Sequence, residues 1–151
     1  MFDNKNIATL NSLIATTLDS VDGYRKAAEE ADAGQFRDIF LSRANERQQV
    51  VADFQAKVRE LGGNPEDDGT VLASAHRAFL GLRDKLTGPR DDDAVIAEVE
   101  RGEDHIKSKF ESALGDADLD ASVRQLIETG YASVRLGHDQ ISALKHGLDA
   151  N

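Results

Sequence analysis

The sequence contains no cysteine, no tryptophan and only two prolines in 151 residues. The absence of cysteine excludes disulfides, thiolate metal sites and cysteine chemistry. With so little proline, long uninterrupted helices can form. Alternating Val/Ile-rich runs, which are typical of strands, are also missing. These absences together favour an all-α fold.

Long apolar runs are missing as well. None approaches the roughly 18 residues that a transmembrane helix needs, and the first residues lack the basic-then-apolar pattern of a signal peptide. The formal net charge of -10 and the pI of about 4.8 argue against binding to nucleic acid or to an anionic membrane. We therefore expect a cytoplasmic protein with no membrane contact, folded as a single domain over residues 1–151.

The stretch from Phe36 to Leu61 organises the rest of the chain. At roughly 100° per residue its apolar side chains form one broad stripe along a helix, and Arg43 and Arg47 lie near the centre of that stripe, one turn apart. A buried guanidinium needs paired acceptors. Neither helix end is close enough for these side chains to reach water. Another part of the chain should therefore supply a carboxylate.

Apolar residues spaced three or four apart predict three further long helices and a shorter one. The expected helices cover residues 4–31, 36–61, 71–86, 91–114 and 119–148. Asp3 and Asp118 are expected to cap the first and the last of them. Gly62 and Gly63 are expected to end the second.

The connection between the second and third long helices determines the topology. It is about 30 residues long, and its own helix and extended flanks can return along the roughly 40 Å of the second helix. The second and third long helices would then run parallel. This arrangement is the ferritin-like four-helix bundle with one helix-containing crossover. The alternative is an up-down-up-down bundle with a long excursion at one end.

In the crossover topology, five polar side chains come to a similar depth in the interior. Glu103 lies in mid-stripe about 15 Å along the third long helix, and Arg47 lies about 18 Å along the second. One interpretation is a buried ion-pair network in which Glu103 pairs with Arg47 or Arg43 and fixes the register of the helices. The expected polar layer comprises Tyr24, Arg43, Arg47, Glu103 and His138.

The other interpretation of this layer is a metal or small-ligand site. A di-iron carboxylate bundle needs two Glu-x-x-His pairs, and both are incomplete here, with glutamine in one histidine position and arginine in one glutamate position. A degenerate iron or zinc site would use Glu103, His138 and Glu46. His76, on the crossover helix, is expected to pack or to form a hydrogen bond rather than to bind a metal.

Three further residues carry simpler expectations. Glu98 lies off the apolar stripe of its helix and is expected to be solvated. Gly23 and Gly130 each precede a tyrosine within a helix. Both glycines are expected to allow two helices to pack closely.

Several short motifs occur along the chain in the order seen in one family. The chain resembles the bacterial ferritin-like four-helix-bundle family of unknown function, of the Pseudomonas type. The resemblance implies the ferritin-like fold with its crossover, and it implies no activity. The motifs that carry it are Leu10–Ile14, Asp19, Gly23-Tyr24, Arg47, Val50-Val51, Leu61–Pro65, His76-Arg77, Glu100–Asp104 and His138–Ile141.

These patterns together predict a non-enzymatic helical bundle without a resident cofactor. We expect it to form a homo-oligomer or to bind an unidentified protein partner, in a stress-related or interaction role. The alternative function is a metal-binding or redox protein with a degenerate ferritin-like site. The two differ in the expected effect of Glu103→Ala, which destabilises the fold in the first case and abolishes metal binding in the second.

Overall fold

A computed structural model of the chain describes residues 2–31, 34–69 and 92–149. Within these ranges the chain forms four long helices and no strand. The expected crossover helix, with His76, lies outside the described residues. None of the described helices is both long and apolar enough to cross a membrane. The helices are α1 (Phe2–Glu30), α2 (Gly34–Glu60), α4 (Asp92–Leu114) and α5 (Ala121–Asp149).

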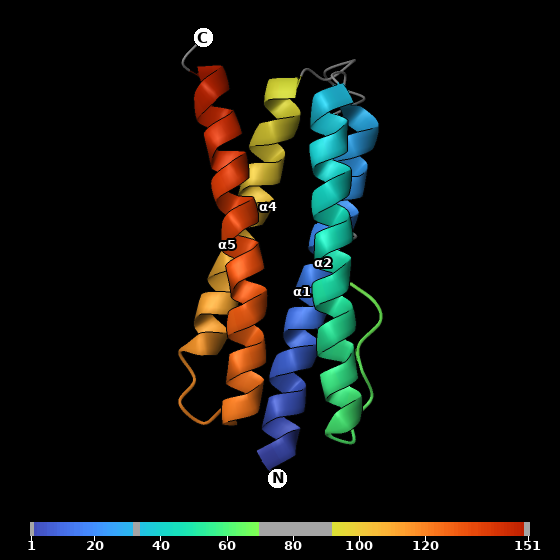
Figure 1. The fold of residues 1–151 in the computed structure, drawn as a ribbon, viewed down its shortest axis with the longest axis vertical. Coiled ribbons are helices and arrows are strands. Elements are labelled where there is room, and N and C mark those ends of the chain that lie inside the picture. The colour runs from blue at the N-terminus through green and yellow to red at the C-terminus, as the bar shows by residue number, and fades with distance from the viewer. Residues whose placement is uncertain (1, 32–33, 70–91, 150–151) are drawn as a thin grey trace.

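The helices form two antiparallel hairpins, α1 with α2 and α4 with α5 (Figure 1). Two contacts fix the direction of α4 relative to α2: Arg47 binds Glu103, and the ring of Phe54 lies 5.9 Å from that of Phe110. Each pair is separated by 56 residues in the sequence. Because seven residues along α2 correspond to seven along α4, these helices run parallel. The crossover topology is confirmed, and the up-down-up-down alternative is wrong.

The end of α2 follows the expectation from its two glycines. Gly62 has φ +88°, a conformation that side chains with a Cβ rarely adopt. Its N–H donates to the carbonyl of Arg59, and the N–H of Gly63 donates to that of Val58. This is a Schellman motif, which satisfies the last carbonyls of the helix. The chain then turns back along the bundle, with the side chain of Asn11 bonded to the backbone of the returning loop.

The two expected N-terminal caps are wrong. Asp3 lies inside α1, which begins at Phe2. α5 begins at Ala121, and the carbonyl of Asp120 accepts the first helical hydrogen bond, from the N–H of Arg124. Asp118 instead forms an ion pair with Lys5 of α1. Several acidic residues close together left the helix start ambiguous in the sequence.

The two glycines next to tyrosines differ in their surroundings. A Cβ added to Gly130 would lie 2.9 Å from Cζ of Phe54 and 3.2 Å from Cε2 of Phe110, so close helix packing at Gly130 is confirmed. A Cβ added to Gly23 would meet nothing within 4 Å. The expectation for Gly23 is therefore wrong.

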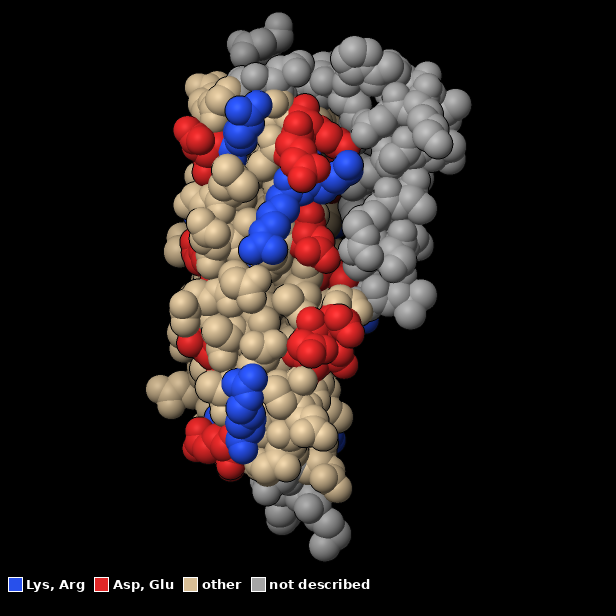
Figure 2. Space-filling model, turned by 90° about the vertical axis from the view of Figure 1, so that its right-hand side faces the viewer, with Lys and Arg blue, Asp and Glu red and all other residues tan. Residues whose placement is uncertain are grey.

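Charged side chains of both signs lie side by side on the face seen in Figure 2. Among the described residues, several ion pairs join side chains one turn apart on the same helix, such as Lys57 with Glu60 on α2. Glu98 departs from this pattern, since its side chain is buried and bound to Arg101. The expectation that Glu98 is solvated is therefore wrong.

The core consists of two apolar clusters, one toward each end of the bundle. The first gathers Leu10, Leu13 and Ile14 with residues of the C-terminal half of α2, the C-terminal half of α4 and the N-terminal half of α5. The second gathers the opposite halves, including Val21, Phe40 and Ile141. Arg47 and Glu103 belong to neither cluster, although both are buried. They lie between the two clusters and form a polar layer across the middle of the bundle.

Candidate functional site

The centre of this layer is a two-fold hydrogen-bonded salt bridge between α2 and α4. Nη1 of Arg47 donates to Oε1 of Glu103 at 2.8 Å, and Nη2 donates to Oε2 at 2.7 Å. The exposed fractions of the two side chains are 0% and 2%. Two parallel N–H···O bonds from one guanidinium to one carboxylate make a strong and geometrically specific pair. Both oxygens of Glu103 are therefore already bound to a cationic donor.

α1 completes the surroundings of Arg47. Nη1 also donates to Oγ of Ser20 at 2.7 Å, and the guanidinium carbon lies 5.5 Å from the ring centroid of Tyr24, within cation–π range. Burial alone lowers the pKa of Arg47, but the hydrogen bonds and negative charge of Glu103 outweigh it, and the net pKa is raised. Arg47 is therefore a permanent positive charge at the centre of the bundle.

α5 contributes space to the layer through Gly137. A Cβ added at this glycine would lie 2.5 Å from Nη2 of Arg47, 3.2 Å from Oε2 of Glu103 and 3.3 Å from Cδ of Arg43. The first distance is far below a normal contact, so a larger residue would collide with the salt bridge. At this level each helix thus supplies one component: Ser20, Arg47, Glu103 and the open space at Gly137.

The other expected members of the layer lie closer to the surface. Arg43 is partly exposed and donates to Glu46 at 2.6 Å and to Gln140 at 2.8 Å. Glu46 also accepts a hydrogen bond from Ser133 of α5. Arg43 and Glu46 therefore form a second polar group that joins α2 to α5 beside the buried salt bridge.

His138 lies on the outer side of the same level. Nε2 of His138 lies 2.7 Å from Oδ1 of Asp104, the residue after Glu103, and Nδ1 lies 3.5 Å from Oδ1 of Asp139. The exposed fractions of the His138 and Asp104 side chains are 18% and 63%. The imidazole therefore faces an acid at the α4–α5 surface, and its ring nitrogens are directed away from the buried salt bridge.

The described residues do not fit a di-iron centre. Such a site needs several carboxylates projecting inward from facing helices, whereas the layer holds one buried carboxylate bonded at both oxygens to Arg47. Glu103, His138 and Glu46 do not form a group of ligand atoms close enough to share an ion. In the described part of the chain, one group does meet that condition, Glu66 with Asp67 and Asp68 in the loop after α2. These acids are largely exposed and lie far from the layer in sequence.

Tyr24 has a buried hydroxyl that makes no hydrogen bond within the described residues. Such an unpaired group costs free energy on folding. Tyr24→Phe should therefore leave the free energy of unfolding unchanged or raise it by up to about 1 kcal/mol. Urea denaturation followed by circular dichroism measures the change. Tyr131→Phe is the control, because its hydroxyl donates to Glu111 at 2.6 Å, and this variant should lose stability.

The pH dependence of stability supplies a second measurement on the same variant. Burial, and secondarily the charge of Glu103, raises the pKa of Tyr24 above its ordinary value of 10.0. Above pH 10 the unfolded chain therefore holds fewer protons at this residue than the folded chain, and stability falls as the pH rises. Tyr24→Phe should reduce this loss relative to the wild type. An equal loss in both proteins would show that folding does not raise the pKa of Tyr24, and a destabilised variant at neutral pH would show that the hydroxyl has a hydrogen-bond partner.

Two members of the layer were not expected from the sequence. Ser20 gives no signal, because a serine facing inward on a helix is common. Gly137 did give a signal in the sequence, since a glycine in the interior of a helix lowers helix stability and usually has a packing or functional role. That reason is the space taken by Arg47 and Glu103.

Comparisons with known proteins agree with this architecture. A family model described as "Domain of unknown function (DUF2383)" matches residues 5–116. No curated protein matches the chain. Among solved structures, the chain is similar to a crystal structure of "ferritin like, diiron-carboxylate proteins" from Bacillus anthracis str. Ames, with a TM-score of 0.73 and 14% identity, covering 96% of this chain and 98% of that one. At that identity the likeness shows the fold alone, which is an all-α ferritin-like four-helix bundle.

Proposed function

The chain belongs to the DUF2383 family, and we propose that it is a non-enzymatic ferritin-like bundle in which a buried salt bridge takes the place of a metal centre. The observation that carries this proposal is the binding of both Glu103 oxygens by Arg47 in a fully buried layer. A guanidinium at this place supplies the positive charge that metal ions supply in a di-iron bundle. It also repels any cation that approaches the same carboxylate.

The role of the layer in this proposal is to hold the two helical hairpins in register. Arg47 belongs to the α1–α2 hairpin, and Glu103 belongs to the α4–α5 hairpin. A shift of one hairpin by a helical turn would leave two buried charges without partners, which is strongly unfavourable. The bundle then acts through its surface, as an interaction module. A stress-related role, self-association and a cytoplasmic location stay predictions.

The proposal predicts that the untagged protein is isolated without stoichiometric metal. We expect that mass spectrometry finds no bound iron or zinc, and that anaerobic calorimetric titration with Fe(II) or Zn(II) shows no tight, saturable binding. Glu103→Gln should not change these results. Asp67→Asn is the control, because it identifies weak binding by the exposed acids after α2.

The similarity to a diiron-carboxylate protein favours one alternative, a metal-binding or redox protein. Its ligands would be Glu103, His138 and Glu46, after Arg47 moves away from Glu103. This alternative requires near-stoichiometric binding of Fe(II) or Zn(II) that is lost in both Glu103→Ala and His138→Ala while the helical content is kept. That result would overturn the salt-bridge proposal.

A further inference from the structure

The outer face of α5 carries a stripe of exposed, uncharged residues. α5 lies at a corner of the bundle between α4 and α2, so one side of the helix faces outward (Figure 1). On that side, exposed residues recur at spacings of three, four and seven, and helical geometry places them within about 40° of one line. The α5 stripe consists of Gln125, Thr129, Ala132, Leu136, Ala143 and Gly147. In a chain with 30% charged residues, an uncharged outer stripe about 33 Å long has the composition expected of a contact surface.

Leu136 lies at the centre of the α5 stripe, eleven residues from each of its ends. It is 64% exposed, compared with 42% for Leu41, the other exposed large apolar residue in the described part of the chain. The nearest residues along the stripe, Ala132 and Ala143, are short, so a second helix can approach closely while Leu136 packs between its side chains. Covering Leu136 removes apolar surface from water, which favours association.

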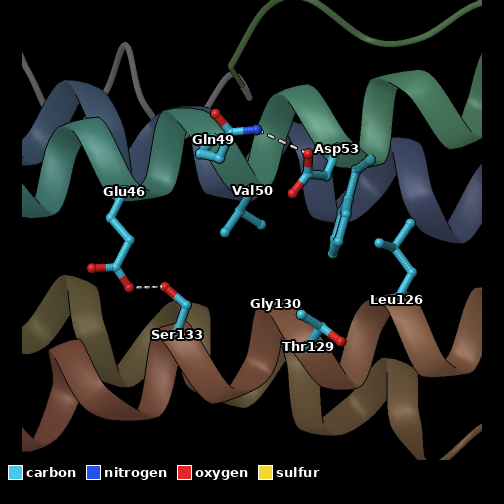
Figure 3. A pocket seen from close by; sticks show the side chains of 9 residues that line it. Glu46, Gln49, Val50, Asp53, Leu126, Thr129, Gly130 and Ser133 are labelled. Atoms are coloured by element: carbon cyan, nitrogen blue, oxygen red, sulfur yellow. Dashed lines mark hydrogen bonds between the residues drawn. The ribbon is translucent and has the colours of Figure 1, made fainter.

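The two edges of the stripe differ in charge. One edge faces α4, because Arg135 lies over the ring of Tyr131, whose hydroxyl donates to Glu111 of α4. The other edge faces α2, because Ser133 points toward Glu46 and donates a hydrogen bond to it (Figure 3). Within residues 121–147, the exposed charged or ionisable side chains of α5 all lie along the α4 edge: Glu128, Arg135, Asp139 and His146.

We propose that the α5 stripe binds the α5 stripe of a second copy of this chain, with the two helices antiparallel about a two-fold axis at Leu136. A two-fold interface must be self-complementary, because the same patch of both copies forms it. The stripe has this property: Gln125 with Gly147, and Thr129 with Ala143, lie at equal distances on either side of Leu136. Leu136 therefore meets Leu136 of the second copy, and Thr129 meets Ala143. This choice of partner rests on the proposed role of the bundle as an interaction module.

The charged edge indicates the antiparallel direction. In this arrangement the α4 edges of the two copies meet each other. Arg135 then lies about 3 Å along the helix axis from Asp139 of the second copy, and Glu128 lies equally close to His146. Each contact occurs twice by symmetry and joins groups that can form a hydrogen bond or an ion pair. A parallel pair would set the charged edge against the uncharged edge and give these groups no partner in the second copy.

Sedimentation velocity of the full chain, from about 10 μM to about 1 mM, tests the proposal. We expect a reversible monomer–dimer equilibrium, since one pair of helices buries less surface than a standard interface. Leu136→Glu places two like charges at the two-fold axis and should weaken the dimer by about tenfold or more. Leu41→Glu is the matched control, because it makes the same change at an exposed leucine of α2 outside the stripe. It should leave dimerisation unchanged, and circular dichroism should show both variants folded.

Introduced cysteines test the direction of the two helices, because the chain has no cysteine of its own. A short bismaleimide should cross-link Leu136→Cys to itself. Thr129→Cys alone should give little cross-linked dimer, since the two copies of residue 129 lie about 21 Å apart in the antiparallel pair. A mixture of Thr129→Cys and Ala143→Cys should cross-link readily. Ser108→Cys, on the exposed side of α4, measures cross-linking by random collision.

Several outcomes would overturn the proposal. A monomer at every concentration would show that the stripe does not bind a second copy. A dimer that Leu136→Glu leaves intact, or that Leu41→Glu weakens equally, would show that association does not depend on the stripe. Self-cross-linking of Thr129→Cys above the level of Ser108→Cys would show a parallel pair. None of these outcomes bears on the metal titrations, so failure of this proposal is distinct from failure of the proposed function.

Discussion

Glu103→Ala should lower the free energy of unfolding by about 3–5 kcal/mol, the effect of removing one partner from a buried ion pair. The wild-type carboxylate is the only acid bound to the fully buried guanidinium of Arg47 among the described residues. Without it, Arg47 keeps one hydrogen bond, to Ser20, and a positive charge that burial penalises. The change can be measured by urea denaturation followed by circular dichroism. A loss of this size is a large fraction of the stability of a typical domain.

Two further variants separate the salt bridge from a general effect of the substitution. Glu128→Ala replaces an exposed glutamate of α5 and should cost less than about 1 kcal/mol. The double variant Arg47→Met/Glu103→Leu replaces both charges by apolar side chains and should recover most of the stability lost in Glu103→Ala. If Glu103→Ala is no more destabilising than Glu128→Ala, Arg47 has another acceptor and the layer does not hold the hairpins together.

The fold follows from the sequence because its signals are long and repeated. Each helix shows its apolar stripe over many turns, and the stripe of α2 continues through Phe36, Phe40, Val51 and Phe54, all of which are buried. The length of the crossover then leaves room for the parallel course of α2 and α4. Helix ends depend on one or two residues, so Asp118 could be mistaken for the cap that Asp120 provides.

The site follows from the sequence only in part. A charged residue in an apolar stripe is informative because burying it alone is so unfavourable, and this argument singled out both Arg47 and Glu103. Helical periodicity gives the direction of a side chain to within a broad sector. It does not separate Arg47, which lies in the core, from Arg43, which turns toward Glu46 and Gln140 at the edge. The same limit applies to His138, whose ring meets Asp104 outside the core.

The space at Gly137 leads to the second large effect. Gly137→Ala should lower the free energy of unfolding by about 1–3 kcal/mol, as expected for overpacking of a filled interior. The added methyl group would lie 2.5 Å from Nη2 of Arg47. Nη2 cannot simply move away, because it is bonded to Oε2 of Glu103 at 2.7 Å. The sign is the informative part, since glycine to alanine within a helix otherwise adds up to about 1 kcal/mol of stability.

Gly102→Ala gives the matched control for this sign. Gly102 lies in α4, next to Glu103, and an added Cβ there meets nothing within 4 Å, so the substitution should stabilise the protein. A third measurement places Gly137→Ala in the Arg47→Met/Glu103→Leu background. With the salt bridge absent, the penalty should shrink, and the coupling between the sites follows from the double-mutant cycle. If Gly137→Ala stabilises the wild type as Gly102→Ala does, the salt bridge can shift without loss of stability. The polar layer would then not hold the two hairpins in a fixed register.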